Sequence, residues 1–397
     1  MTPVSAPCPE ATAEVAAPLV SRRVPFDAIP RPAWERLLGA TARATPFSRW
    51  TFHRAWWDAY AETAHEEYLV CLRPGSASAE VGAALAPDDL VAIVPLMHRH
   101  EVEPDDLATR TVLRQAARQP VTPVPAFAKA VFFAASYHAD YATLLCDPAD
   151  LAAVAARLVG CLASGPDPGH GAVDWDVVDL RRLREDDPAL PAIEDAFRAA
   201  APGLGWTVVR EQEDVCPVLR LDTADWEAYL QTLPAKGRHE VRRKMRRAAA
   251  AGEVRFETIP DPAAFVDDFV AIHQARWGDE GLFPDTAGGA RSRRFLRRLA
   301  ELEGPGGAFQ FGRLMVGERV IFATAAFVQD GVCYFYNAGA LPGARDLSPG
   351  VVGVAAYLQD RMAAGCRSFD FLRGDEPYKY EWGAVDAPIH RLLISRG

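Results

Sequence analysis

The chain has 397 residues, of which 49% are hydrophobic and 24% charged, so it has a globular composition and the length of two domains. This composition excludes an intrinsically disordered chain and a fibrous one. The formal net charge of -10 disfavours a nucleic-acid coat protein, which would be basic overall. Residues 1–200 hold 18 basic and 27 acidic residues, whereas residues 201–397 hold 25 and 26. An anionic ligand is therefore expected to prefer the second half.

Cysteine usage and hydropathy predict the compartment. The seven cysteines are widely spaced without a CxxC motif, which favours neither a disulfide framework nor a zinc site and fits a reducing cytoplasm. No segment approaches the roughly 18 uninterrupted apolar residues of a membrane span. Residues 1–25 lack the basic start and apolar block of a signal peptide. We predict a cytoplasmic protein without a metal, in which residues 1–25 form a disordered tail.

The first half is predicted to alternate helices with strands. An aromatic, helix-like segment at 46–60 carries Trp50, His53, Trp57 and Tyr60 on one face, as expected for a packed core. Strands are expected at 68–72, 90–96, 140–146, 175–180, 205–210 and 215–221, and helices at 148–163 and 188–200.

The second half has the same style of alternation. Helices are expected at 226–233, 237–251, 262–277, 291–302 and 349–364, and strands at 254–259, 309–315, 319–329, 331–338, 368–372 and 390–395. The pairs Gly317-Glu318 and Asp330-Gly331 are hairpin signals between successive strands. A meander followed by a helix and a strand indicates an α+β fold with a mixed sheet in each half.

A candidate anion site lies at 345–351, where a strand runs through a loop into a helix. Ser348 suits the N-cap position and Pro349 the first helical position. A helix start with free N–H groups and Arg345 nearby can hold a phosphate or a diphosphate. A Ser-Pro helix cap without any ligand is the alternative.

Three further groups of residues are candidates for chemistry. The loop after Phe371 is dense in ionisable and aromatic residues, and it offers Asp370 or Glu376 as a general base and Tyr378 as a general acid, unless it is a salt-bridged turn. The helix at 237–251 is strongly basic, which fits contact with an anionic acceptor, a tRNA or a membrane face, or else pairing with the acidic first half. His273, near a helix end, is either packed or part of an acceptor pocket.

The Arg-x-x-Ser-x-Gly loop at 345–350 resembles the pyrophosphate loop of GNAT acyltransferases, Gln/Arg-x-x-Gly-x-Gly/Ala, with Ser348 in place of the first glycine. With the segment 369–383, and with Pro46-Phe47 and Trp56-Trp57, it resembles the CelD-type acyltransferases, which are associated with cellulose and exopolysaccharide synthesis. That family is similar to the Fem-type peptidyltransferases, which contain two GNAT-like domains in tandem. The likeness covers roughly residues 45–397.

The resemblance implies an α+β fold of two tandem GNAT-like domains, a degenerate one at 26–205 and an acyltransferase domain at 206–397. It implies transfer of an acyl group, above all acetyl, from acyl-coenzyme A to an amine or hydroxyl of a small or lipid-linked anionic acceptor such as an envelope polysaccharide precursor. No metal, covalent intermediate or DNA partner is expected. The alternatives are a Fem-like peptidyltransferase that uses aminoacyl-tRNA and a non-catalytic GNAT-like regulator of polysaccharide synthesis.

The resemblance also implies a set of site residues, with the donor's pantetheine arm between the strands at 332–338 and 368–372. The expected coenzyme contacts are Arg345, Ser348, Gly350, Val351, Tyr334 and Tyr336. The expected acceptor contacts are Arg242, Arg246, His273, Arg276, Trp277, Arg373, Lys379 and Trp382, beside the catalytic candidates Asp370, Glu376 and Tyr378.

Overall fold

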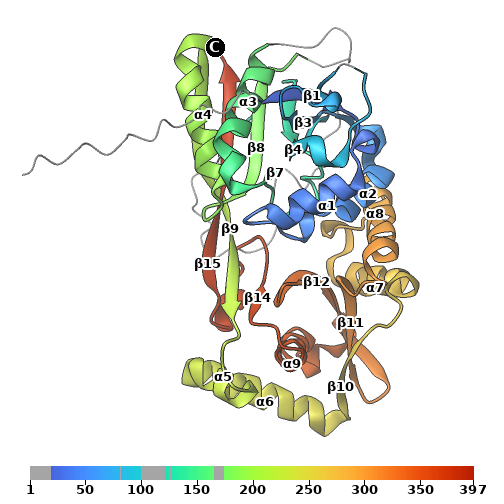
Figure 1. The fold of residues 1–397 in the computed structure, drawn as a ribbon. Helices are drawn as coiled ribbons and strands as arrows, with labels where there is room; N and C mark the ends of the chain where they lie inside the picture. The colour runs from blue at the N-terminus through green and yellow to red at the C-terminus, as the bar shows by residue number, and fades with distance from the viewer. Residues whose placement is uncertain (1–18, 81, 100–120, 126, 165–173) are drawn as a thin grey trace, which may run out of the picture.

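The fold is that of a computed structural model, which describes residues 19–80, 82–99, 121–125, 127–164 and 174–397 (Figure 1). The elements of the N-terminal half are β1 (Val20–Val24), α1 (Arg31–Ala40), α2 (Trp50–Tyr60), β2 (Ala64–Glu66), β3 (Tyr68–Leu72), β4 (Leu90–Val94), β5 (Leu96–Arg99), β6 (Ala130–Phe133), β7 (Leu145–Cys146), α3 (Leu151–Ala163), β8 (Val177–Arg184) and α4 (Ala189–Leu204). Those of the C-terminal half are β9 (Trp206–Arg220), α5 (Trp226–Thr232), α6 (Ala235–Ala251), β10 (Val254–Thr258), α7 (Pro262–Trp277), α8 (Ala287–Glu303), β11 (Phe309–Val316), β12 (Arg319–Gln329), β13 (Val332–Ala340), α9 (Pro349–Ala363), β14 (Ser368–Asp370), α10 (Pro377–Glu381) and β15 (Val385–Arg396).

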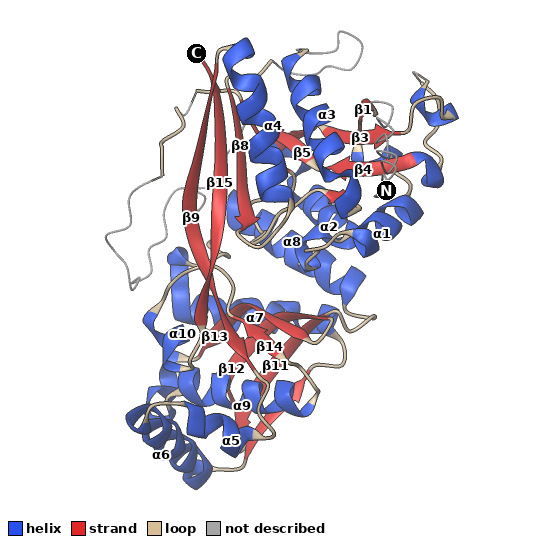
Figure 2. Ribbon diagram, turned by 60° about the vertical axis from the view of Figure 1, so that its left-hand side comes forward, coloured by secondary structure: helices blue, strands red, loops and turns tan. Residues whose placement is uncertain are grey.

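One large sheet runs through both halves of the molecule. Its strand order is β10-β11-β12-β13-β14-β9-β15-β8-β6-β5-β2, and a smaller sheet has the order β1-β3-β4-β7. The long strands β9 and β15 pair in antiparallel fashion and extend from one half into the other (Figure 2). The pairs β13–β14 and β6–β8 are parallel, so the large sheet is mixed, as predicted.

A buried ion pair fastens β15 into the sheet of the N-terminal half. The strand lies between β8 and β9 and pairs with both. The fully buried guanidinium of Arg391 donates from Nε and Nη2 to the two carboxylate oxygens of Asp179, at 2.6 and 2.9 Å. Its Nη1 donates to Glu211 on β9 at 3.1 Å. The same side chain therefore bonds to both neighbouring strands.

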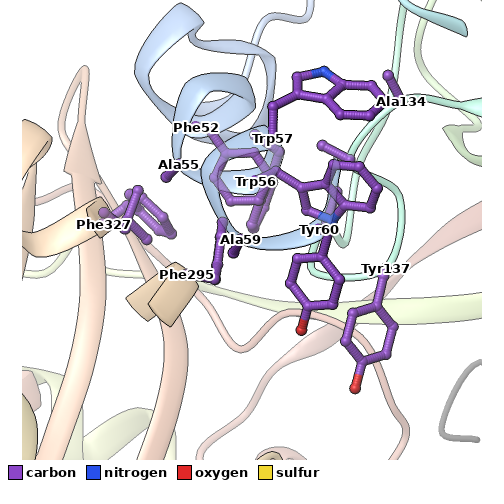
Figure 3. Packing of buried hydrophobic residues seen from close by; sticks show 14 of the residues in the cluster. Phe52, Ala55, Trp56, Trp57, Ala59, Tyr60, Ala134, Tyr137, Phe295 and Phe327 are labelled. Atoms are coloured by element: carbon purple, nitrogen blue, oxygen red, sulfur yellow. The ribbon is translucent and has the colours of Figure 1, made fainter. Parts of the chain in front are cut away.

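The predicted aromatic helix is confirmed as α2, and it packs against the C-terminal half. Figure 3 shows Phe52 of α2 on the side of Phe295 of α8 and Phe327 of β12, and Tyr60 of the same helix beside Tyr137. The ring centroid of Phe52 lies 5.3 Å from that of Phe295 and 6.2 Å from that of Phe327. The two halves are thus joined by a continuous apolar core as well as by the sheet.

Three sequence expectations about the elements are wrong. Residues 20–24 form β1 and pair with β3, so the tail does not extend to residue 25; residues 1–18 lie outside the described part. The strands expected at 205–210 and 215–221 are one strand, β9, because β15 supplies a partner along nearly its whole length. The strand expected at 140–146 is limited to β7, since Asp140 and Tyr141 bond to the C-terminal half instead.

The predicted domain boundary at 205/206 falls between α4 and β9, where Gly205 ends the helix with a φ of 66°. Because β9 and β15 extend into the N-terminal half, that half contains strands from both sides of the boundary. The division into two domains at this residue stays a prediction.

Replacing Arg391 with Met is expected to lower the free energy of unfolding by about 3–5 kcal/mol, because Asp179 is left buried without its main partner. Denaturant titration measures the loss. The control is Arg396→Met at the edge of the same strand, where the ion pair with Asp174 is exposed and worth less than about 1 kcal/mol. A similar small loss in both variants would show that the strand is held by its backbone ladder alone.

Candidate functional site

The strands β13 and β14 separate after a short parallel contact. Their pairing ends at Tyr334–Asp370, the third residue pair. Beyond it β13 stays with β12 as far as Ala340, whereas the chain after Asp370 turns to β9, where the N–H of Phe371 donates to the carbonyl of Pro217 at 2.9 Å. The sheet therefore opens between these two chains at the end where their C-termini lie.

Helix α9 begins at the same end of the sheet. Ser348 stands at the N-cap position as predicted, but its φ of 54° and ψ of 56° are left-handed and its hydroxyl makes no capping bond. The N–H groups of Ser348 and Val351 donate to carbonyls within the turn. Gly350 is exposed, its N–H has no bond within the described residues, and a side chain there would meet open space. The turn is thus open to an anion, chiefly at Gly350.

The structure brings the basic helix α6 to this turn. The Nη2 of Arg247 donates to the Ser348 hydroxyl at 2.6 Å, and the exposed Arg345 stands three residues before it. The guanidinium of Arg319 lies against Gly343 in the same loop. Arg247 therefore touches the start of α9, where the helix dipole adds positive potential, and Arg345 and Arg319 belong to or contact the loop that precedes it.

The cations of α6 are incompletely neutralised. Arg242 pairs with Glu227, and Glu240 pairs with Arg243 and Lys244. Arg246 and Arg247 are exposed and form no ion pair with any described residue. Both acidic partners belong to the second half, and α6 lies at the end of the molecule remote from the N-terminal half (Figure 1). The expectation that α6 pairs with the acidic first half is therefore wrong.

Asp370, a predicted base, is a buried carboxylate where the strands separate. Its Oδ2 accepts a hydrogen bond from the hydroxyl of Tyr141 at 2.7 Å and its Oδ1 from the N–H of Leu372 at 2.8 Å. Burial raises the pKa of Asp370 to about 6, against the opposing effect of those two bonds and of Arg184. The group is thus mainly ionised at neutral pH and close enough to its pKa to exchange a proton.

The side chain of Lys379 bonds to the loop after β14, so it is not available to contact a substrate. The buried ammonium donates to the carbonyls of Leu372, Arg373 and Gly374 at 2.8–3.0 Å and pairs with Glu376 at 2.9 Å. An ammonium has three protons to donate, so none remains for an acceptor. The expected substrate contact at Lys379 is therefore replaced by a structural one.

The remaining predicted residues are spread around this loop and β13. Tyr378, on α10, is 41% exposed and lies beside Phe371. Trp382 is buried in the core beneath α9, and the hydroxyl of Tyr229 donates to its carbonyl, which contradicts a substrate contact. Tyr334 and Tyr336 face the opposite side of β13 from α9, since they pack with the core that joins the two halves.

The predicted acceptor wall on α7 is partly buried. His273 is 3% exposed among Phe269 and Phe283, and burial lowers its pKa to about 4, so it is a neutral packed group. Trp277 is half-buried and its indole N–H points to the Ala338 carbonyl on β13 at 3.4 Å. The exposed Arg276 stacks on that indole. These two residues lie beside the open end of β13, whereas His273 does not reach solvent.

The segment 137–141, Tyr-His-Ala-Asp-Tyr, of the N-terminal half was not among the predicted site residues. Its His138 contacts the Tyr336 hydroxyl at 3.1 Å, Asp140 pairs with Arg373 at 3.3 Å, and Tyr141 holds Asp370. Four of the five residues in this segment are ionisable or aromatic, a density similar to that of the loop after β14. That density was the signal by which the segment could have been found.

Comparison with known proteins identifies the second half. Residues 235–380 match the model of the acetyltransferase (GNAT) domain. The crystal structure of FemX is similar at a TM-score of 0.57 and 8% identity, over 94% of this chain and 96% of that one. A conserved protein of unknown function from Bacteroides thetaiotaomicron is similar at a TM-score of 0.52 and 10% identity, over 95% of this chain and 100% of that one. L-PGS from Bacillus licheniformis is similar at a TM-score of 0.51 and 9% identity, over 95% of this chain and 94% of that one. No curated protein sequence matches the chain.

These findings confirm the fold class, a GNAT-type α+β fold with mixed sheets flanked by helices. They also confirm an acyltransferase enzyme over the non-catalytic alternative, since residues 235–380 form a GNAT acetyltransferase domain, and such domains in general use an acyl-coenzyme A donor. Within the described residues no helix has the length and apolar character to cross a bilayer, and no cluster of three potential metal ligands occurs.

Ser348→Gly is expected to give a more stable protein than Ser348→Ala by about 1–2 kcal/mol, because both lose the hydroxyl but only glycine adopts a positive φ without cost. Thermal or denaturant unfolding of the two variants measures the difference. The control is Ala249→Gly at an exposed position of helix α6, where the backbone is right-handed. There glycine should be less stable than alanine by about 1 kcal/mol. Equal stability of the Ser348 variants would mean that the turn is not left-handed in solution.

Proposed function

We propose that the protein transfers an acyl group, above all acetyl, from acyl-coenzyme A to an amine or hydroxyl of an anionic acceptor in the cytoplasm. The observation that carries this proposal is that β13 and β14 separate at the end of the sheet where α9 begins among exposed cations. A pantetheine arm needs unpaired strand backbone beside it, and a diphosphate needs positive charge and free N–H groups. Both requirements are met at neighbouring places.

The donor's diphosphate would lie against the Gly350 N–H, with Arg345 and Arg247 supplying charge. The Arg247 guanidinium contacts the turn and needs only to leave the Ser348 hydroxyl to reach a phosphate, and the exposed Arg345 lies three residues before Ser348 in the same loop. Tyr334 and Tyr336, on the other face of β13, would border the acyl end rather than the diphosphate. Trp277 and Arg276 are the candidates for the wall on the acceptor side.

The chain's own residues would move two protons. Asp370 takes the proton from the acceptor amine or hydroxyl as its nitrogen or oxygen bonds to the thioester carbon. Tyr378 gives a proton to the sulfur as the carbon–sulfur bond breaks, so that free coenzyme A leaves. Glu376, beside the same loop, is the alternative base. Holding donor and acceptor together supplies much of the acceleration, and no covalent enzyme intermediate is required.

The acceptor class is inferred from α6. Arg242 and Arg246 lie on one exposed face of this helix, and Arg246 has no anionic partner among the described residues. By contrast, the arginines of α8 that face solvent are paired with Glu62, Asp267 and Asp58. Charge left without a partner on α6 suits a phosphate-bearing acceptor, and the CelD-type resemblance suggests a lipid-linked envelope precursor.

A Fem-like transfer from aminoacyl-tRNA is the second candidate. It is favoured by the likeness to FemX over 94% of the chain and by the same basic helix, which would contact the RNA backbone. It makes no use of the turn at Gly350.

Replacing both Arg247 and Arg345 with Ala is expected to weaken acetyl-coenzyme A binding by about tenfold or more, because each removes a charge-assisted contact with the diphosphate. Calorimetric titration of the wild-type protein and the double variant measures the change. Arg297→Ala on α8 is the control, since Asp267 already neutralises that side chain. An unchanged dissociation constant in the double variant would remove the turn from the donor site.

Replacing Arg242 and Arg246 with Glu should leave acetyl-coenzyme A binding intact and weaken the binding of any polyanionic partner. This double variant therefore helps to distinguish the two candidate functions. Thermal unfolding of the wild type with acetyl-coenzyme A or with bulk tRNA shows which of the two binds. A ligand at 100 times its dissociation constant stabilises the folded protein by about 2.7 kcal/mol. The Fem-like function would be favoured if tRNA, but not acetyl-coenzyme A, stabilised the wild type. The double variant should then bind tRNA more weakly, and its tRNA binding should depend less on salt concentration.

A further inference from the structure

The segment 137–141 of the N-terminal half spans the place where β13 and β14 separate. His138 contacts Tyr336 on the β13 side, and Tyr141 and Asp140 contact Asp370 and Arg373 on the β14 side. The residues joined in this way are far apart in sequence, 198 positions for His138–Tyr336 and 229 for Tyr141–Asp370. Both halves of the chain therefore contribute side chains to the same small region.

We propose that Tyr141 is a positioning residue for acyl transfer, whose hydroxyl holds the carboxylate of Asp370 in the orientation and ionisation state needed of a base. This inference rests on the function proposed above, which makes Asp370 the base. It assigns the N-terminal half a part in the reaction, whereas the sequence resemblance implied a degenerate domain.

The geometry leaves Asp370 few other partners. Its two described hydrogen bonds come from the hydroxyl of Tyr141 and the backbone N–H of Leu372, one to each oxygen. The backbone bond anchors Oδ1 to the turn, where Leu372 has a φ of 57°. The Tyr141 bond alone fixes Oδ2, so its loss leaves that oxygen buried without a donor, a costly arrangement for an anion.

The surroundings of Asp370 define how its charge depends on Tyr141. Besides Tyr141, five ionisable groups interact electrostatically with Asp370: Arg184 of β8, Cys216 of β9, Cys333 and Tyr334 of β13, and Asp140. Arg184 acts in part through Tyr141, because its guanidinium lies 4.9 Å from the centre of that ring. Burial raises the pKa of Asp370 and the Tyr141 bond lowers it, so removing the hydroxyl raises that pKa further.

The segment is anchored independently of the Tyr141 hydroxyl. The two ring nitrogens of His138 lie 2.9 Å from the Tyr60 hydroxyl and 3.1 Å from the Tyr336 hydroxyl, and its ring stacks on Phe295 at 4.2 Å. The ring of Tyr141 packs beside Phe47 in the core. Tyr141→Phe keeps these contacts, so it is expected to fold and to change only the bond to Asp370.

The test compares the full-length wild type with Tyr141→Phe, using acetyl-coenzyme A as donor and water as acceptor. The thiol released is measured against pH. We expect the acid limb of the pH–rate profile to move to higher pH by at least about half a unit and kcat at pH 7 to fall by about tenfold or more. The KM and the dissociation constant for acetyl-coenzyme A should stay within about twofold, because Tyr141 does not touch the α9 turn.

The matched control is Tyr229→Phe, which removes another buried hydroxyl, one that bonds the carbonyl of Trp382 and not Asp370. It should lower stability without moving the pH profile. In parallel, carbon-13 NMR of labelled aspartate follows the titration of the Asp370 carboxyl, assigned with Asp370→Asn, and should show the same upward displacement in Tyr141→Phe.

The outcomes separate this inference from the function on which it rests. If the wild type turns over and Tyr141→Phe has the same kcat and profile, Tyr141 is only a packing residue and the inference is overturned while the proposed function stands. If the wild type neither binds acetyl-coenzyme A nor releases thiol, the proposed function fails and takes the catalytic role of Tyr141 with it. An unaltered Asp370 titration in Tyr141→Phe also overturns the inference.

Discussion

The feature on which the rest of the structure depends is the place where the pairing of β14 with β13 ends. Over residues 368–370 this strand pairs with both β13 and β9, and after Asp370 the N–H of Phe371 still donates to Pro217 of β9 whereas the pairing with β13 stops. Strand β9 is in turn held by β15, which the buried pair of Arg391 and Asp179 fixes in the N-terminal half. The opening in the sheet therefore lies beside a strand pair, β9 and β15, that extends into both halves.

Charge is distributed to match this opening. The molecule is acidic overall, yet Arg247 of α6 and Arg319 of β12 contact the loop that leads into α9. Both faces of β13 are buried, one in the apolar core under α9 and the other in the core that joins the halves. The exposed cations thus lie near the start of α9, whereas Asp370, beside β13, is a buried carboxylate with a raised pKa.

Much of the fold could be predicted from the sequence because its signals are local. Helix α7 has the bounds predicted for it, and Asp261 caps it through its side chain. The site was harder, since residue type alone does not distinguish a substrate contact from a core residue. Lys379 and Trp382 fit either role until their burial is known. Tyr141 and Asp370 lie 229 positions apart, and no periodicity or spacing connects residues at that distance. The sequence showed that Ser348 departs from the GNAT loop pattern, but neither its left-handed conformation nor its contact with Arg247 could be predicted from it.

The strand order also restricts when each half can be completed during synthesis. The N-terminal half lacks the strand between β8 and β9 until residues 385–396 have been made, because β15 occupies that place. The two partners in its central ion pair are 212 positions apart, so their meeting closes a very long loop. Until then the edge of β8 is open and Asp179 has Arg181 of its own strand as an ionic partner but not Arg391. An exposed sheet edge of this kind is where a nascent chain is prone to wrong pairing and benefits from a chaperone.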